Sequence, residues 1–182
     1  LPGALFVRHG AAGAASDLQQ PLIGADGRFM FAAQARLDNR LELAAALDIA
    51  AADLAGIADD ALILRMIDRS GDRGLARCLG AFAFALWDAD TGRLILGRDC
   101  LGHRPMFFHA GRGFVAFATT LRTLLALPDV PRQLDDMVLA NFLAINLGEP
   151  HRTFYRDVER VPSRMLVTID RAGVAQRAYW SP

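Results

Sequence analysis

The sequence has 182 residues, enough for one domain with a sizeable core, and its 53% content of hydrophobic residues excludes a disordered chain. The 20 Lys and Arg residues balance 20 Asp and Glu residues, and no block of like charge occurs, so the charge pattern favours no nucleic-acid or anionic-membrane partner. No apolar run approaches the roughly 18 residues of a membrane span, and we expect a cytoplasmic protein.

Hydrophobic spacing and turn residues predict strands and helices along the first half of the chain. In chain order they are strands at 4–7 and 28–33, a helix that Asn39 caps, a helix from Asp59 to Gly71, and a short helix at 73–79.

The most informative segment is the strand over 81–87. Phe82, Phe84 and Leu86 share one face, and alanines fill most of the other, so neither face is polar and both should be covered. We expect the large face to pack against a second sheet, and the alanine face to let helices approach closely.

Three antiparallel hairpins and two helices complete the prediction. The hairpins are 81–87 with 93–97, 106–109 with 114–118, and 164–169 with 174–177, and the helices are 120–126 and 135–146. This order predicts an α+β fold, with two stacked antiparallel sheets and helices outside, in a single domain over residues 1–182.

Four residues between the strands of the middle region suggest either a pocket or a turn. We favour a structural turn held by charge-assisted hydrogen bonds, formed by Arg98, Asp99, Gly102 and Arg104. The two tryptophans, Trp87 and Trp180, are interpreted as packing aromatics.

The histidines and cysteines show no metal-ligand spacing, and no metal site is predicted. We expect the histidines to be exposed, namely His103, His109 and His151. The two cysteines, Cys78 and Cys100, are expected to be reduced, buried thiols.

Several segments, in the right order, resemble the amidotransferase domain of the asparagine synthetase family. Residues 80–88 read GAFAFALWD and residues 97–105 read GRDCLGHRP, similar to the family's G-x-F-A-F-A-L-W/Y-D and R-D-x-x-G-x-x-P. Further similar segments are RLDNR at 36–40, FATTLRTL at 117–124, TFYRDVERVP at 153–162 and YWSP at 179–182. The resemblance covers about residues 33–182 and implies an Ntn-hydrolase fold, a four-layer αββα sandwich of two antiparallel sheets.

The family hydrolyses glutamine with an N-terminal Cys, whose own α-amino group serves as base. The resemblance places Pro2 at that position and puts the Gln34–Ala35 pair where the family has the Asn-Gly of its oxyanion hole. The segment carrying the arginine that binds the glutamine carboxylate has no counterpart between residues 10 and 31. Only Asp59 remains of the glutamine pocket, and because helix capping fully explains an Asp at this position, we favour capping over a ligand role.

We therefore expect a degenerate glutaminase-like domain that has lost glutamine hydrolysis and serves as scaffold for the synthetase domain of an ATP-dependent amide-forming ligase. Family members without the Cys include β-lactam synthetases and lasso-peptide macrolactam synthetases, and the RLDNR segment favours the second. No cofactor is expected in this domain. ATP and Mg²⁺ are expected in a synthetase domain, in cis or as a separate chain, because its S-G-G-x-D-S loop does not occur in the sequence. A homo-oligomer is kept as an alternative assembly.

Two alternatives remain. An active glutamine-dependent asparagine synthetase would need its nucleophilic Cys upstream of Leu1. A histidine phosphatase would use His9 as nucleophile, because Arg8-His9-Gly10 resembles the opening of that family's active site. The phosphatase needs a polar residue after Gly10 and a parallel sheet, whereas small apolar residues and antiparallel hairpins are what this sequence offers.

Overall fold

The computed structural model describes residues 20–24, 26–146 and 148–181. The predicted strand at 4–7, the nucleophile position Pro2 and the phosphatase candidate His9 lie outside these residues. Within the described part, the strands form a six-stranded sheet in the order β1-β2-β3-β4-β8-β9 and a three-stranded sheet in the order β6-β5-β7. Every neighbouring pair is antiparallel, which confirms the predicted sheets.

The larger sheet consists of β1 (Leu22–Ile23), β2 (Phe29–Leu37), β3 (Gly80–Asp88), β4 (Arg93–Arg98), β8 (Met165–Asp170) and β9 (Gly173–Ala178). The smaller sheet consists of β5 (Phe107–Gly111), β6 (Phe114–Ala118) and β7 (Glu159–Arg160). The helices are α1 (Arg40–Ala46), α2 (Ala51–Leu54), α3 (Asp59–Leu75), α4 (Leu121–Leu125) and α5 (Asp136–Leu143).

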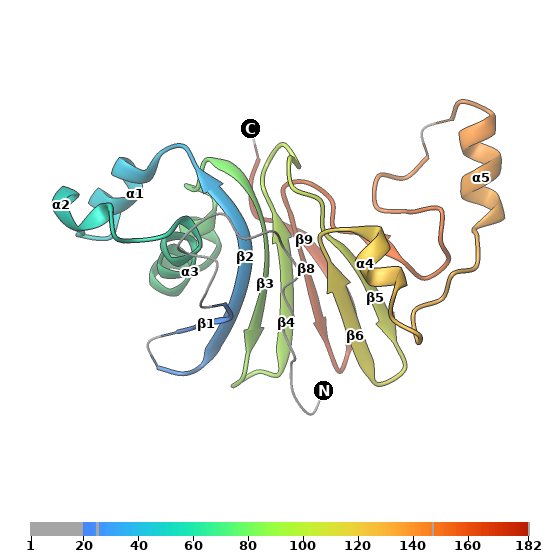
Figure 1. The fold of residues 1–182 in the computed structure, drawn as a ribbon, viewed down its shortest axis with the longest axis horizontal. Coiled ribbons are helices and arrows are strands. Elements are labelled where there is room, and N and C mark those ends of the chain that lie inside the picture. Colours follow the sequence, from blue (N-terminus) through green and yellow to red (C-terminus); the bar gives the residue numbers. More distant parts are fainter. Residues whose placement is uncertain (1–19, 25, 147, 182) are drawn as a thin grey trace.

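In Figure 1 the helices α1, α2 and α3 lie to the left of the larger sheet, and α4 lies on the right, with the smaller sheet. One core cluster joins α1 and α3 to the larger sheet, a second lies between the two sheets, and a third joins α4 to the smaller sheet. This arrangement confirms the expected α+β fold of antiparallel sheets with helices outside. Among the described residues, no helix is long and apolar enough to cross a membrane.

The two faces of β3 pack in the opposite sense to the prediction. Phe82, Phe84 and Leu86 face α3, whereas Ala83 and Ala85 face the smaller sheet. The large rings fill the space under the helices, where Phe84 stacks on Phe31 with centroids 5.5 Å apart. The alanines make room on the other side for large side chains from the smaller sheet, including Met106 and Phe108.

Gly97 of β4 allows Phe84 to occupy this position. A Cβ atom at Gly97 would lie 2.5 Å from the Phe84 ring and 2.7 Å from Leu166 Cδ2, closer than van der Waals contact permits. The position therefore requires a residue without a side chain, because the ring of the neighbouring strand fills the space.

The hairpin between β3 and β4 is anchored by an ion pair. Arg28 donates from Nε to Asp88 Oδ1 at 2.9 Å and from Nη2 to Oδ2 at 2.7 Å. Asp88 also accepts from the backbone N–H of Asp90 at 3.1 Å. The bonds from Arg28 lower the pKa of the buried Asp88 carboxyl to about 2.

Other elements depart from the prediction in detail. Asn39 precedes α1 but makes no side-chain cap; its amide instead donates to Arg77 O and accepts from Leu79 N–H. Gly71 does end the helix that begins at Asp59, as predicted: its non-helical φ/ψ angles form a kink within α3, and a second, short helix follows it to Leu75. The elements β1, α2 and β7 were not predicted, and α5 is shorter than the expected helix at 135–146. Both tryptophans pack against core clusters, as expected.

Candidate functional site

Asp59 lies in the first turn of α3, where the sequence suggested a cap. The N-cap residue is Ala58, and it makes no side-chain cap bond. The Asp59 carboxylate instead accepts from the backbone N–H of Leu37 at 2.8 Å and from the guanidinium of Arg40. The capping explanation is therefore wrong: Asp59 joins the end of β2 and the start of α1 to α3.

Arg40 completes this connection. Its Nη2 donates to Leu54 O at 2.9 Å and to Ile57 O at 2.7 Å. The side chains of Arg40 and Asp59 are 31% and 19% exposed, so the pair is partly shielded from water. Both oxygens of the Asp59 carboxylate thus have partners within the domain.

Gln34 and Ala35 lie on β2, close along the strand to the Leu37 N–H that binds Asp59. Gln34 pairs in register with Ala83 and is exposed, whereas Ala35 pairs with Phe82 and is half-buried. The expected pocket residues that the structure describes therefore gather at one end of β2. No hydrogen bond joins Gln34 to Asp59 in the described structure.

A second polar contact beside this end of β2 was missed by the sequence reasoning. The side-chain amide of Gln20 accepts from Ala33 N–H at 3.1 Å and donates to Ala33 O at 2.7 Å. It also donates to Asp60 Oδ2 at 2.7 Å, and Asp60 is buried. No local pattern marks Gln20, because its partners lie 13 and 40 residues further along the chain.

Asp99 organises the turn that follows β4. Its side chain is fully buried and accepts from four backbone N–H groups, those of Phe82, Leu101, His103 and Arg104. These bonds to the charged form outweigh the opposing effect of burial, so the pKa of Asp99 lies below its usual value. The geometry is that of a structural turn.

Arg98 connects the same turn to the smaller sheet. Its Nη1 donates to Val161 O at 3.0 Å, and its Nη2 donates to Gly102 O. Burial lowers the pKa of Arg98. A Cβ atom at Gly102 would lie 2.7 Å from Arg98 Nη2, and the φ of +72° there also favours glycine. The Nε atoms of Arg98 and Arg104 are buried and have no hydrogen-bond partner among the described residues.

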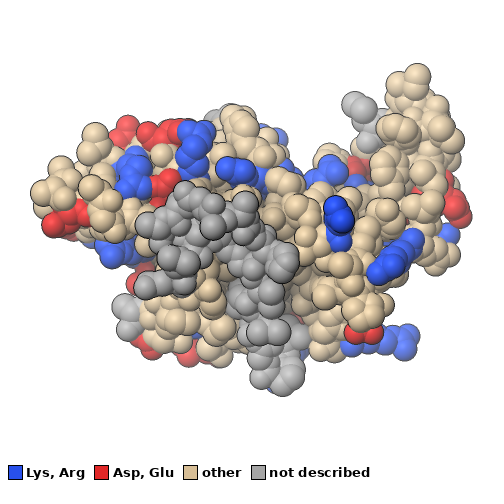
Figure 2. All heavy atoms as spheres, viewed as in Figure 1, with Lys and Arg blue, Asp and Glu red and all other residues tan. Residues whose placement is uncertain are grey.

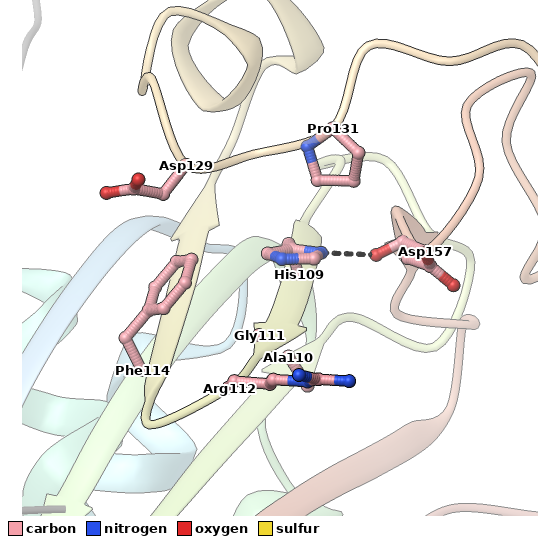
Figure 3. Close-up of a pocket in the computed structure, with 8 residues that line it drawn as sticks. All are labelled: His109, Ala110, Gly111, Arg112, Phe114, Asp129, Pro131 and Asp157. Atoms are coloured by element: carbon pink, nitrogen blue, oxygen red, sulfur yellow. Dashed lines mark hydrogen bonds between the residues drawn. The ribbon is translucent and has the colours of Figure 1, made fainter.

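A separate open groove of about 660 Å³ lies on the smaller sheet, between the β5–β6 hairpin and Asp157 (Figure 3). The prediction that His109 is exposed is wrong: His109 is 6% exposed and packs against the Phe114 ring. Its Nδ1 lies 2.7 Å from the backbone oxygen of Asp157. Because a carbonyl can only accept, Nδ1 carries the proton and Nε2 is left as an acceptor when the ring is neutral.

The surface charges do not gather into a patch on the face that Figure 2 shows, where arginines and acidic side chains are interspersed. Within the described residues, no group of three His, Cys, Asp or Glu side chains could hold a metal ion. His103 is exposed, as expected, whereas His151 is half-buried, so the prediction that it is exposed is wrong.

Residues 7–180 match the family model described as a glutamine amidotransferase domain. The chain belongs to this family. A provisionally named glutamine-hydrolysing asparagine synthetase of Mycobacterium tuberculosis is 32% identical over 108 residues, 58% of this chain and 17% of that protein. Asparagine synthetase 2 of Bacillus subtilis, also named glutamine-hydrolysing, is 25% identical over 171 residues, 90% of this chain and 22% of that protein.

The fold of this amidotransferase domain agrees with solved structures. Glutamine phosphoribosylpyrophosphate amidotransferase of Bacillus subtilis superimposes with a TM-score of 0.60 at 17% identity, over 94% of this chain and 34% of that one. A class-II glutamine aminotransferase domain protein of Silicibacter pomeroyi gives a TM-score of 0.51 at 12% identity, over 93% of this chain and 74% of that one. The chain spans about a fifth of the length of the curated relatives named above.

The two thiols of this amidotransferase domain are both free. Cys78 is buried, and burial raises the pKa of its thiol to about 12, so it stays protonated. Cys100 lies beside Asp99 in the turn after β4 and is half-buried, which corrects the expectation that both thiols are buried. Both cysteines carry acylated backbone nitrogens, so neither has a free α-amino group.

Proposed function

We propose that this amidotransferase domain has lost glutamine hydrolysis and acts as scaffold for the synthetase domain of an ATP-dependent amide-forming ligase. The observation that carries the proposal is the bonding of Asp59. Of the positions that the family resemblance assigns to glutamine, Asp59 alone keeps its residue type, and Arg40 and the Leu37 N–H occupy its oxygens. A carboxylate held in this way is poorly placed to receive the ammonium group of a substrate.

The thiols support the same proposal. Cysteine-dependent hydrolysis needs a thiolate and a base. Cys78 is protonated and enclosed, and the turn that contains Cys100 is organised by the carboxylate of Asp99. Pro2 stands where the resemblance places the nucleophile, and it offers no thiol.

The ligase is proposed to close an amide with an amine already present in its substrate, as in lasso-peptide macrolactam formation, so that it needs no ammonia. The RLDNR segment favours this type. Its Asn39 and Arg40 hold α1 to neighbouring segments, which suits a scaffold. ATP and Mg²⁺ would bind the synthetase domain, in cis or in a separate chain.

The test is an assay of glutamate release from L-glutamine by the full-length protein, with and without ATP. We expect release at the background of a heat-denatured sample, and no change in the variant Asp59→Asn. Release well above background that Asp59→Asn lowers by about tenfold or more would show a working glutamine pocket and reject the proposal.

The names of the curated relatives favour a second candidate, an active glutamine-dependent asparagine synthetase. It requires a Cys from outside the present sequence and a glutamine pocket without the family's arginine. The same assay distinguishes the two, because this candidate predicts glutamate release coupled to ATP.

The family match over residues 7–180 includes His9, and it gives the histidine phosphatase alternative no support.

A further inference from the structure

Helix α5 packs against neither sheet in the described structure; its aromatic contact is between Phe142 and Phe154 of the adjacent loop, with ring centroids 5.3 Å apart. None of its residues is buried. Phe142 is 65% exposed, Leu143 is 80% exposed, and Ile145, just after the helix, is 90% exposed. Figure 1 shows α5 standing apart from both sheets, at the end of the molecule beyond α4.

The composition of α5 is that of a buried helix. Its sequence DMVLANFL is apolar on almost every side, a pattern typical of helices that are enclosed by protein. Of the twelve large hydrophobic residues exposed in the described chain, six lie between 134 and 154, so the exposure concentrates in this one lobe. Exposed apolar surface of this density marks an interaction site.

Polar bonds hold the helix in place. Asp135 caps it by accepting from Met137 N–H at 3.1 Å and Val138 N–H at 3.2 Å, and also pairs with Arg152. Arg156 pairs with Asp136 at 3.1 Å. Because these charges at the base of the helix already neutralise one another, the surface offers no attraction to a strongly acidic or basic partner.

We infer that α5 and Ile145 form a docking surface for an apolar face of the synthetase domain, joined to this domain in the same polypeptide. The inference rests on the proposed function, which supplies the identity of that domain. Its support is the length of the relatives: the shared segment makes up only 17% and 22% of the two asparagine synthetases. In each of these relatives, several hundred residues lie outside the shared segment and could contact it.

The size of the surface favours a linked domain over a second copy of this chain. A helix of eight residues is only about 12 Å long, so the surface that it offers is small. A stable association of separate proteins needs about 800 Å² on each partner. A covalent link raises the effective concentration into the millimolar range, so a smaller surface suffices.

The test uses the full-length protein with a protease recognition sequence inserted after residue 182. After cleavage, we expect the two parts to co-elute from a size-exclusion column. Leu143→Lys should separate them, because a desolvated ammonium would face the apolar partner, while lysine is a good helix former and suits a helix C-terminus. The matched control is Leu101→Lys, at a turn residue that is 75% exposed, and it should leave the parts together.

Three results would overturn the inference. The first is separation of the wild-type parts after cleavage. The second is co-elution of the parts in the Leu143→Lys variant. The third is separation in the Leu101→Lys control equal to that in Leu143→Lys. Light scattering identifies the other occupant: a doubled mass of the uncut protein that Leu143→Lys halves would assign the surface to a second copy. ATP-dependent release of pyrophosphate by the uncut protein tests the ligase separately, so its absence with intact co-elution would reject the proposed function and leave a docked domain of another activity.

Discussion

Replacing Arg40 with Ala tests whether the Asp59 contact holds the helical layer to the sheet. The substitution removes the ion pair to Asp59 and two bonds to the carbonyls of Leu54 and Ile57. Hydrogen bonds from charged groups contribute about 1.5–3 kcal/mol each when buried. Because the pair is 31% and 19% exposed, solvent screens it, and we expect a total loss of about 3 kcal/mol.

Chemical denaturation with guanidinium chloride measures this loss as a lower midpoint at an unchanged m-value. Arg36→Ala is the matched control, because Arg36 also pairs with an aspartate, Asp38, but the two side chains are 61% and 52% exposed. We expect the control to lose less than about 1 kcal/mol. If Arg40→Ala and Arg36→Ala differ by less than about 0.5 kcal/mol, the three bonds of Arg40 do not hold α1, α2 and α3 together as argued.

Three further predictions concern packing, pH and thiol chemistry. Gly97→Ala should cost about 1–3 kcal/mol by overpacking, whereas Gly56→Ala, whose Cβ would meet only a backbone oxygen at 3.7 Å, should change the denaturation midpoint little. Asp88 has a folded pKa of about 2, below the 3.8 of an unperturbed aspartate, so its stabilisation is present above pH 4 and lost as the pH falls towards 2. Asp88→Asn should flatten the stability curve in that window. Titration with a disulfide reagent should modify Cys100 in the native protein and reach Cys78 only in denaturant, because Cys78 is buried. Equal rates of modification would contradict this reasoning.

The sequence carried enough information to predict the two antiparallel sheets because the strands of the middle hairpins have clear two-residue periodicity. Residues 81–87 and 93–97 correspond closely to β3 and β4. The elements that were missed are two to four residues long. A strand such as β1 exists through its pairing with β2, where Leu22 lies opposite Phe31, and no local pattern can reveal such a partner.

Side-chain size along β3 predicted correctly that both faces are covered, but it did not determine which layer covers each face. That depends on the side chains that the neighbouring layer supplies. The smaller sheet brings Met106 and Phe108 to the alanine face, and α3 leaves a space on the other side that Phe84 fills. The burial of His109 has a similar origin, because its partner Asp157 lies 48 residues away in the sequence.

The assignment of Gln34 and Asp59 to a glutamine pocket stays a prediction from the family resemblance, whereas the contacts that Asp59 makes are long-range. The bond between Asp59 and Arg40 joins residues 19 apart. A working substrate site needs polar groups that keep hydrogen-bonding capacity for a ligand. Asp59 and Asp99 instead direct their oxygens to groups of the same domain, where they connect strands, helices and turns. An acidic residue at a family's ligand position can therefore persist because the fold depends on it, which is how a scaffold without hydrolysis would retain Asp59.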